Sequence, residues 1–370
     1  MKFSIIVPVY NRPNEVDELL ESLTLQSFMD FEVIIVEDGS KITCKDVCDK
    51  YADILTLRYY EKENSGPGQS RNYGAERAEG EWLIILDSDV VLPQGYMENL
   101  ELKIKNYDMS QDVKSESTDG MRGNHNSQLS TLNYPLVAFG GPDTAHPSFT
   151  PTQKAISYSM TSFFTTGGIR GGKAKLDKFY PRSFNMGIRK DVYMQLGGFS
   201  KMRFGEDIDF SYRICEAGYR PRLFPEAWVW HKRRTDFRKF FRQVYNSGIA
   251  RINLEKRHPG TMKLVHMLPA AFTIGVIGCC LLSAILALLS LLSIFNIQYS
   301  IIPLLPILLY ALLILVDSTR QNRSLWVGLL SIPAAFIQLM GYGTGFLAAW
   351  WKRCVRKQDE FTAFEKTFYK

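Results

Sequence analysis

The chain has 370 residues and a net charge of +6, with 44 Lys and Arg against 38 Asp and Glu. This length exceeds that of one typical domain. The positive charge is concentrated in residues 232–257, which hold nine Lys or Arg and two acids. Because uncharged apolar tracts follow directly, we interpret this segment as cytoplasmic and facing lipid head groups, which argues against a nucleic-acid-binding protein.

The N-terminal half alternates between two kinds of apolar pattern. Phe3–Val9 is typical of a buried strand, and it is too short for the apolar region of a secretory signal. The next expected elements are a helix at Pro13–Gln26, a strand at Phe31–Val36, a short helix, a strand at Leu55–Tyr60, a helix at Gln69–Ala78 and a strand at Trp82–Leu86. This order predicts an α/β fold with a mostly parallel sheet flanked by helices. Ligands bind such sheets at the carboxyl ends of the strands.

The middle of the chain is harder to interpret. Asn106–Asn133 is rich in Ser, Asn, Asp and Gly and predicts a mobile polar insertion, and Thr165–Lys175 predicts a Gly-rich basic loop. The later elements that we expect are strands at Leu136–Phe139, Phe184–Ile188 and Arg222–Trp230, and helices at Lys190–Leu196 and Asp207–Ala217.

Acidic residues follow two of the predicted strands. Asp87-Ser88-Asp89 comes directly after Trp82–Leu86, and Asp38 ends the second strand. Carboxylates at the open end of a buried strand are costly unless they bind a cation or a hydrogen-bonding ligand. Mg²⁺ or Mn²⁺ fits, since such ions combine one or two carboxylates with phosphate oxygens. Two acids in a surface turn are also common, so this motif alone is weak.

The loop Gly66–Asn72 precedes a helix whose free backbone N–H groups could receive an anion. Arg71 in this loop adds a charge that pairs well with phosphate. A Gly-rich helix start with a solvated Arg is the simpler interpretation. In favour of the anion site, Asp38, this loop and Asp87-Ser88-Asp89 all fall at one predicted edge of the sheet.

Together these segments resemble the family-2 glycosyltransferases of the GT-A fold over residues 1–250. The resemblance rests on the ordered motifs Val7-Pro8-Val9-Tyr10-Asn11, Val36-Glu37-Asp38-Gly39-Ser40, Gly66–Asn72, Leu86-Asp87-Ser88-Asp89 and Phe204-Gly205-Glu206-Asp207-Ile208-Asp209. It implies an inverting enzyme that binds a nucleotide-sugar donor through Mn²⁺ or Mg²⁺. The processive members carry Gln-x-x-Arg-Trp where this chain has Gln243-Val244-Tyr245-Asn246, which speaks against a polymer-extruding synthase.

The resemblance also implies roles for single residues. Those expected to bind the donor are Pro8, Tyr10, Asp38, Gly68, Arg71, Asn72 and Asp87. Asp89 would be the principal metal ligand, and Asp207 the general base that takes the proton of the acceptor hydroxyl. Asp207 could equally be a helix N-cap, and His231 is either structural or a ligand of the metal or phosphate.

The C-terminal third predicts a membrane domain. Residues 264–316 contain no Asp, Glu, Lys or Arg, and neither do Leu325–Trp351, so three spans fit at about residues 268–294, 299–316 and 325–350. We therefore divide the chain into a catalytic domain (1–235), a basic pre-membrane helix (236–262), a membrane domain (263–351) and a tail (352–370). Three crossings would put the basic residues 352–357 outside, against the usual preference, so we expect one tract, the third, to be re-entrant or interfacial.

The sequence thus predicts a multi-pass membrane enzyme with a cytoplasmic catalytic domain. It would transfer sugar from a nucleotide-diphosphate sugar, with UDP-sugars preferred, to a hydroxyl of a lipid-linked or membrane-proximal glycan acceptor in surface polysaccharide or glycan synthesis. Two alternatives stay open: a sugar-phosphate nucleotidyltransferase, and a non-catalytic membrane scaffold. The first would require a Gly-rich loop after the first strand, where this chain has Pro8-Val9-Tyr10-Asn11-Arg12-Pro13.

Overall fold

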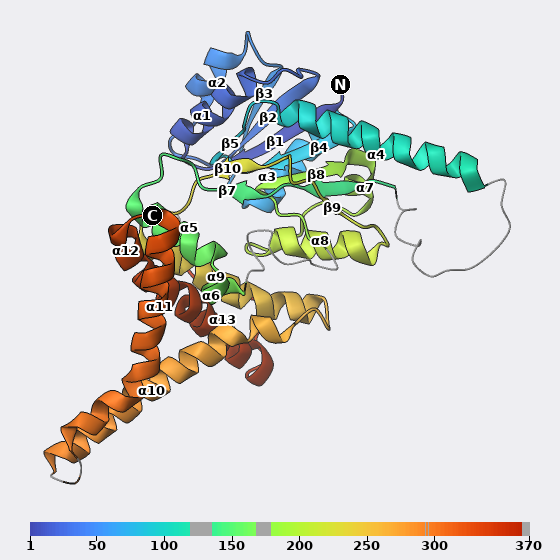
Figure 1. The fold of residues 1–370 in the computed structure, drawn as a ribbon. Helices are drawn as coiled ribbons and strands as arrows, with labels where there is room; N and C mark the ends of the chain where they lie inside the picture. Colours follow the sequence, from blue (N-terminus) through green and yellow to red (C-terminus); the bar gives the residue numbers. More distant parts are fainter. Residues whose placement is uncertain (119–134, 168–178, 293, 295, 365–370) are drawn as a thin grey trace. The chain divides into compact units, whose positions relative to one another are not determined.

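The computed structural model describes residues 1–118, 135–167, 179–292, 294 and 296–364, and Figure 1 shows the elements. The chain forms two compact units. Unit 1 comprises Met1–His146 and Leu176–Lys232, and unit 2 comprises Pro147–Lys175 and Arg233–Lys370. Each unit is therefore built from two separate stretches of the sequence, and we describe each by itself.

Among the described residues, unit 1 is built on a seven-stranded sheet. In sheet order its strands are β3 (Leu57–Lys62), β2 (Phe31–Asp38), β1 (Phe3–Val9), β4 (Trp82–Leu86), β8 (Asn185–Arg189), β6 (Ala138–Gly140) and β9 (Arg222–Leu223). The first four strands are parallel to one another, and β8 runs antiparallel to both of its neighbours. The predicted α/β fold with a mostly parallel sheet is confirmed.

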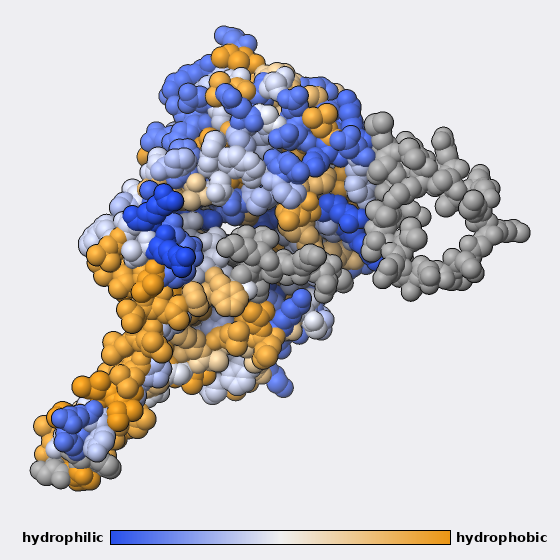
Figure 2. All heavy atoms as spheres, viewed as in Figure 1, coloured by the Kyte–Doolittle hydropathy of each residue, from blue (hydrophilic) through white to orange (hydrophobic). Residues whose placement is uncertain are grey.

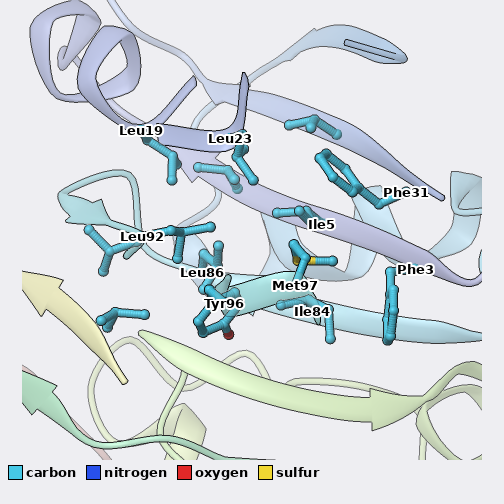
Figure 3. Close-up of a cluster of buried hydrophobic side chains, with 14 of the residues drawn as sticks. Phe3, Ile5, Leu19, Leu23, Phe31, Ile84, Leu86, Leu92, Tyr96 and Met97 are labelled. Atoms are coloured by element: carbon cyan, nitrogen blue, oxygen red, sulfur yellow. The ribbon is translucent and has the colours of Figure 1, made fainter. Parts of the chain in front are cut away.

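Side chains of the central strands alternate between two apolar cores, one on each face of the sheet. Ile5 and Ile84 belong to the first core, and their neighbours Ile6 and Ile85 to the second. The first core also contains apolar residues of α1 (Pro13–Thr24), α2 (Lys45–Tyr51) and α4 (Tyr96–Thr118), and the second those of α3 (Pro67–Arg77), α7 (Lys190–Gln195) and α8 (Glu206–Glu216). Figure 3 shows the first core, where Leu19 and Leu23 of α1 face the strands. Burial on both faces explains the continuous apolar runs of these strands.

A second, three-stranded sheet joins distant parts of unit 1. It consists of β5 (Val90–Val91), β10 (Val229–His231) and β7 (Asp143–Thr144), with β10 in the middle. His231 pairs with Val90, and Val229 pairs with Asp143. This small sheet joins β5, which directly follows the predicted acidic motif, with Asp143 and His231, two residues far along the chain.

Three predictions about the middle of the chain need correction. The strand expected at Arg222–Trp230 is two strands, β9 and β10, which belong to different sheets because the chain turns between Phe224 and Ala227. The polar insertion expected from Asn106 is helical as far as Thr118, since α4 continues to that residue; residues 119–133 lie outside the described part. The basic loop begins inside α6 (Phe163–Thr166), and its residues 168–175 also lie outside.

Unit 2 is helical in its described part. Its α-helices are α5 (Pro151–Thr161), α6, α9 (Phe237–Arg257), α10 (Leu268–Leu291), α11 (Leu305–Asn322), α12 (Leu325–Phe336) and α13 (Tyr342–Trp350). Three helical stretches are long and apolar enough to cross a membrane, namely Leu268–Leu291, Ile297–Asn322 and Leu325–Val355. Apolar side chains dominate the visible surface of α10 and α11 in Figure 2. Between the first and second of these stretches, Asn296 caps the helical turn that begins at Ile297.

The third apolar stretch differs from the other two. In its most apolar segment of 18 residues, 39% is buried inside the protein, compared with 0% and 6% in the corresponding segments of the first and second stretches. It packs along α9 through glycines: a Cβ atom on Gly345 would lie 2.0 Å from the carbonyl oxygen of Tyr245, and one on Gly248 2.1 Å from that of Tyr342. Small residues of this kind let two helix backbones approach closely. The third stretch is therefore fixed to the basic helix α9.

Candidate functional site

Three potential metal ligands meet beside the small sheet. Asp87 and Asp89 lie between β4 and β5, and His231 ends β10. One ligand atom from each lies within 4.8 Å of the others. Two carboxylates and an imidazole suit Mn²⁺ and are compatible with Mg²⁺ that keeps phosphate or water ligands. The residues present therefore fit the predicted metal, and they include His231, for which the sequence left two interpretations open.

His231 lies between two carboxylates. Its Nε2 atom is 3.3 Å from Asp89 Oδ1, and its Nδ1 atom is 3.4 Å from Asp143 Oδ2. The Phe184 ring stacks on the imidazole with centroids 5.0 Å apart. A histidine that binds a metal usually directs its second nitrogen to a carboxylate, which fixes the ring orientation. Asp143 occupies that position here.

A positively charged side chain also approaches the metal ligands. The guanidinium of Arg12, which follows β1, pairs with Asp89 Oδ2. The side chain of Asp89 is only 12% exposed, so its charge needs compensation. Arg12 and His231 thus contact the two different oxygens of Asp89.

Arg71 connects the acidic motif with α8. One terminal nitrogen lies 2.7 Å from Asp87 Oδ1 and the other 3.0 Å from Glu206 Oε1. Burial lowers the pKa of Arg71, but the two carboxylates outweigh this effect and raise it above its ordinary value. Its side chain is 3% exposed. The predicted contact with a phosphate stays a prediction, while the structure shows a buried bridge between two carboxylates.

Asp207 lies in the first turn of α8, one residue after Glu206. It is not the N-cap, which is Gly205 with a left-handed backbone. Oδ2 of Asp207 accepts a hydrogen bond from Nε of Arg182 at 2.6 Å. Burial raises the pKa of Asp207, but Arg182, Arg71 and the Ile208 amide together lower it by more, so the pKa is below its ordinary value. This carboxylate is ionised at neutral pH, as a proton acceptor must be.

Glu206 has the opposite tendency. Burial and the neighbouring charge of Asp207 raise its pKa to about 7. The two adjacent acids of this turn therefore differ in their protonation behaviour, a pattern typical of sites that handle protons.

Asp38 ends β2 and is only 4% exposed. Its Oδ1 accepts hydrogen bonds from Lys62 Nζ at 2.7 Å and from the Ser65 amide at 2.9 Å, and its Oδ2 accepts one from the Gly66 amide at 2.9 Å. A carboxylate has about four acceptor positions. One position on Oδ2 is therefore left for the predicted contact with a nucleobase.

The other predicted donor-binding residues lie in β1, directly after it, or in α3. Pro8 is buried in β1, and Tyr10 follows it partly exposed. Asn72 fixes the segment after α7: its Oδ1 accepts from the Phe199 amide at 2.8 Å, and its Nδ2 donates to the Phe199 carbonyl at 2.8 Å. Gly68 packs against the same segment, where a Cβ atom would lie 3.2 Å from Phe199 Cβ. For Gly68 and Asn72 the structure shows packing roles, and their contact with a donor stays a prediction.

Two family models match the chain in succession. The model described as glycosyl transferase family 2 matches residues 4–177, and that described as glycosyl transferase family group 2 matches residues 183–316. The chain belongs to glycosyl transferase family 2. The first match includes Asp87 and Asp89, and the second includes Asp207 and His231.

Curated relatives of this family-2 member match over short segments. An uncharacterised glycosyltransferase of Haemophilus influenzae is 50% identical over 86 residues, which are 23% of this chain and 29% of that protein. The poly(ribitol-phosphate) beta-N-acetylglucosaminyltransferase TarS of Staphylococcus aureus is 42% identical over 93 residues, or 24% of this chain and 16% of that protein. An uncharacterised glycosyltransferase of Rickettsia felis is 36% identical over 104 residues, or 28% of this chain and 17% of the relative. The chain thus matches well under a third of the length of each.

A solved structure supports the fold. The mannosyltransferase PcManGT from Pyrobaculum calidifontis, in complex with GDP-Man and Mn²⁺, superimposes with a TM-score of 0.53 at 16% identity, covering 82% of this chain and 85% of that one. At this identity the similarity concerns the fold alone. It agrees with the GT-A architecture expected for a family-2 glycosyltransferase.

Four residues of the site were missing from the predicted set. Glu206 stands inside a motif that carries the resemblance and Arg12 directly follows another, so the sequence contained a signal for both. Asp143 and Arg182 stand in the part of the sequence without clear periodicity. Only the pairing of β7 with β10 brings Asp143 to His231, and nothing in the local sequence indicates that contact.

Proposed function

We propose that this protein transfers a sugar from a nucleotide-diphosphate sugar to a hydroxyl of a glycan acceptor, with inversion at the anomeric carbon. The observation that carries the proposal is the meeting of Asp87, Asp89 and His231 within 4.8 Å in a family-2 fold. These residues would hold Mn²⁺ or Mg²⁺ against the donor diphosphate. When bound, the ion supplies positive charge that stabilises the departing nucleoside diphosphate.

Asp207 is the general base of this proposal. The acceptor oxygen attacks the anomeric carbon while the bond from that carbon to the diphosphate oxygen breaks, and Asp207 takes the hydroxyl proton. Arg182 keeps Asp207 ionised before the reaction. Arg71 holds Asp87 and Glu206 in fixed positions, so that the acidic motif and the start of α8, which carries Asp207, keep their spacing.

The nucleotide and the acceptor are the less constrained parts of the proposal. We favour a UDP-sugar, with Pro8, Tyr10 and Asp38 lining the nucleobase pocket, since the matched segment of TarS belongs to an N-acetylglucosaminyltransferase. The three apolar helical stretches favour a lipid-linked or membrane-proximal acceptor, as in the synthesis of a surface polysaccharide. A nucleotidyltransferase is the weaker alternative, because both family models are of glycosyltransferases.

Metal-dependent donor binding tests this proposal. We expect Mn²⁺ together with one UDP-sugar of a panel that includes GDP-mannose to raise the Tm of the detergent-solubilised chain by about 5–10 °C, which corresponds to about 2.7 kcal/mol at 100-fold saturation. The shift should vanish under EDTA and in Asp89→Asn. Glu216→Gln, an exposed acid at the end of α8, is the matched control and should keep it. Equal shifts with and without metal would refute the metal bridge.

We further propose that two of the three apolar stretches cross the bilayer, with the catalytic unit on the cytoplasmic side. The third stretch packs along α9, and α9 carries Lys and Arg that cannot lie in the hydrocarbon region without great cost. The third stretch would then lie at the head-group level beside α9. Two crossings return the basic residues 352–357 to the cytoplasmic side, where such residues are preferred.

Cys354, an exposed thiol at the C-terminal end of the third stretch, allows a direct test. In sealed membrane vesicles of known orientation, with Cys215, Cys279 and Cys280 replaced by Ala, we expect a membrane-impermeant maleimide to label Cys354 from the cytoplasmic side. A cysteine introduced by Glu216→Cys reports the side of the catalytic unit, and Cys354→Ser is the background control. Labelling of the two positions from opposite sides would show three crossings.

A further inference from the structure

Unit 1 has an open hollow of about 530 Å³ next to the small sheet. It is lined by Pro142, Asp143, Thr144, Ala145, Pro225, Trp228 and Trp230. These residues come from β7 and its flanks and from the segment between β9 and the end of β10. The mechanism above does not use the hollow.

Two tryptophans form its aromatic wall. The rings of Trp228 and Trp230 lie with centroids 4.9 Å apart and an angle of 87° between their planes. Both side chains are partly exposed, whereas Val229 between them is fully buried. Because successive strand residues point to opposite faces, the two tryptophans lie on the face of β10 opposite to Val229 and His231. Large partly exposed aromatic side chains of this kind mark binding surfaces more often than isolated apolar residues do.

Asp143 joins the hollow to the candidate metal site. It lines the hollow, and its Oδ2 atom lies 3.4 Å from Nδ1 of His231. Asp143 pairs with Val229, so its carboxylate lies on the His231 face of the small sheet, whereas the exposed Thr144, which pairs with Trp230, has its side chain on the face of the tryptophans. A ligand in the hollow would therefore be one side chain away from a residue that we assign to the metal.

The chemistry of the lining selects the kind of ligand. Among the described residues that line the hollow there is no Lys or Arg, and the carboxylate of Asp143 disfavours an anion such as a phosphate head group. Aromatic faces carry negative charge density and attract the C–H bonds of a flat apolar surface, while a threonine hydroxyl accepts O–H donors and donates in turn. A neutral pyranose ring combines an apolar C–H face with a rim of hydroxyls.

We propose that this hollow is a subsite for a neutral pyranose unit of the acceptor glycan, with the ring against Trp228 and its hydroxyls on Thr144. The inference rests on the proposed transferase function and extends it to acceptor recognition. The subsite would hold a sugar unit away from the reacting hydroxyl and so add acceptor affinity without taking part in the chemistry.

The test is a binding titration of the detergent-solubilised full chain with neutral tetrasaccharides, namely maltotetraose, cellotetraose and chitotetraose, followed by tryptophan fluorescence. We expect saturable binding of at least one of them. Trp228→Leu should weaken that binding about ten-fold, because the aromatic face is lost while the side chain stays apolar. Trp228→Phe should stay within about three-fold of the wild type. Both variants should keep the metal-dependent shift with the UDP-sugar.

Several outcomes would overturn the subsite. Binding of none of the three sugars, or equal binding by the wild type and Trp228→Leu, would do so. Weaker association of Trp228→Leu with vesicles of phosphatidylethanolamine and phosphatidylglycerol, with unchanged sugar binding, would show that the tryptophans contact the membrane instead. Sugar binding without any metal-dependent donor shift would support the subsite and refute the transferase function, so the two failures are distinguishable.

Discussion

Replacement of Arg71 by Ala should destabilise unit 1 more than replacement of any exposed arginine. Arg71 is 3% exposed and pairs with Asp87 and Glu206, so its removal leaves two carboxylates without their cation. Breaking a buried ion pair costs about 3–5 kcal/mol, and each kcal/mol lowers Tm by about 2–4 °C for a unit of this size. We expect a fall in Tm of about 10 °C or more, measured by thermal unfolding of the solubilised chain.

A matched control separates burial from charge. Arg189→Ala removes an arginine whose side chain is 40% exposed and pairs with Asp191; exposed pairs of this kind contribute about 0–1 kcal/mol, so Tm should hardly change. Arg71→Lys should lie between the two, because a lysine keeps the charge but cannot reach two carboxylates in the same forked geometry. If Arg71→Ala and Arg189→Ala had the same Tm, the bridge would have no structural importance.

Asp207→Asn should lower sugar transfer by about 10²–10⁴-fold, the range that a positioned general base contributes. The amide keeps the shape of the side chain but cannot accept the acceptor's proton. Donor binding should persist, so the metal-dependent thermal shift serves as the control for folding. Glu216→Gln should transfer at the wild-type rate. Transfer by Asp207→Asn within three-fold of the wild type would disprove the assignment of the base.

The pH profile gives a second measurement on Asp207. Its pKa is lowered below the ordinary Asp value, so the active, ionised form is present above that value and is lost only as the pH falls through the lowered pKa. Between pH 5 and 8 we therefore expect no loss of kcat from protonation of Asp207. Glu206, with its pKa raised to about 7, titrates within this window. A change in kcat near pH 7 that disappears in Glu206→Gln would be due to Glu206.

The sequence was most informative for the elements whose side chains are all in the same environment, as in a strand that is buried on both faces. The strands Phe3–Val9 and Trp82–Leu86 could be predicted because both of their faces are buried, which makes them continuously apolar. The acidic motif after β4 could be found for the same reason, since its position follows from the strand before it. Asp89 and His231 could be predicted one by one, but their proximity could not be derived from spacing alone.

Other features depend on contacts that no local pattern records. Pro225 did not identify the break between β9 and β10, because a single proline is compatible with an edge strand as well as with a turn. The role of Arg71 is a similar case: a solvated and a buried arginine look alike in sequence, and only the positions of Asp87 and Glu206 make it a bridge. Asp143 belongs to a strand of two residues, too short for any periodicity.

The discontinuity of unit 2 has a consequence for the order in which the chain is synthesised. Helix α5 buries Ala155 and Ile156 against residues of α9 and α12, among them Phe240 and Val327. Those partners leave the ribosome roughly 80 and 170 residues later, which at about 5–20 residues per second is a delay of several seconds to half a minute. Throughout that interval the apolar residues of α5, Ala155, Ile156 and Met160, lack these partners. Nascent chains of this protein should therefore depend on chaperone or membrane contact at residues 151–161 well before the first apolar stretch, Leu268–Leu291, has been made.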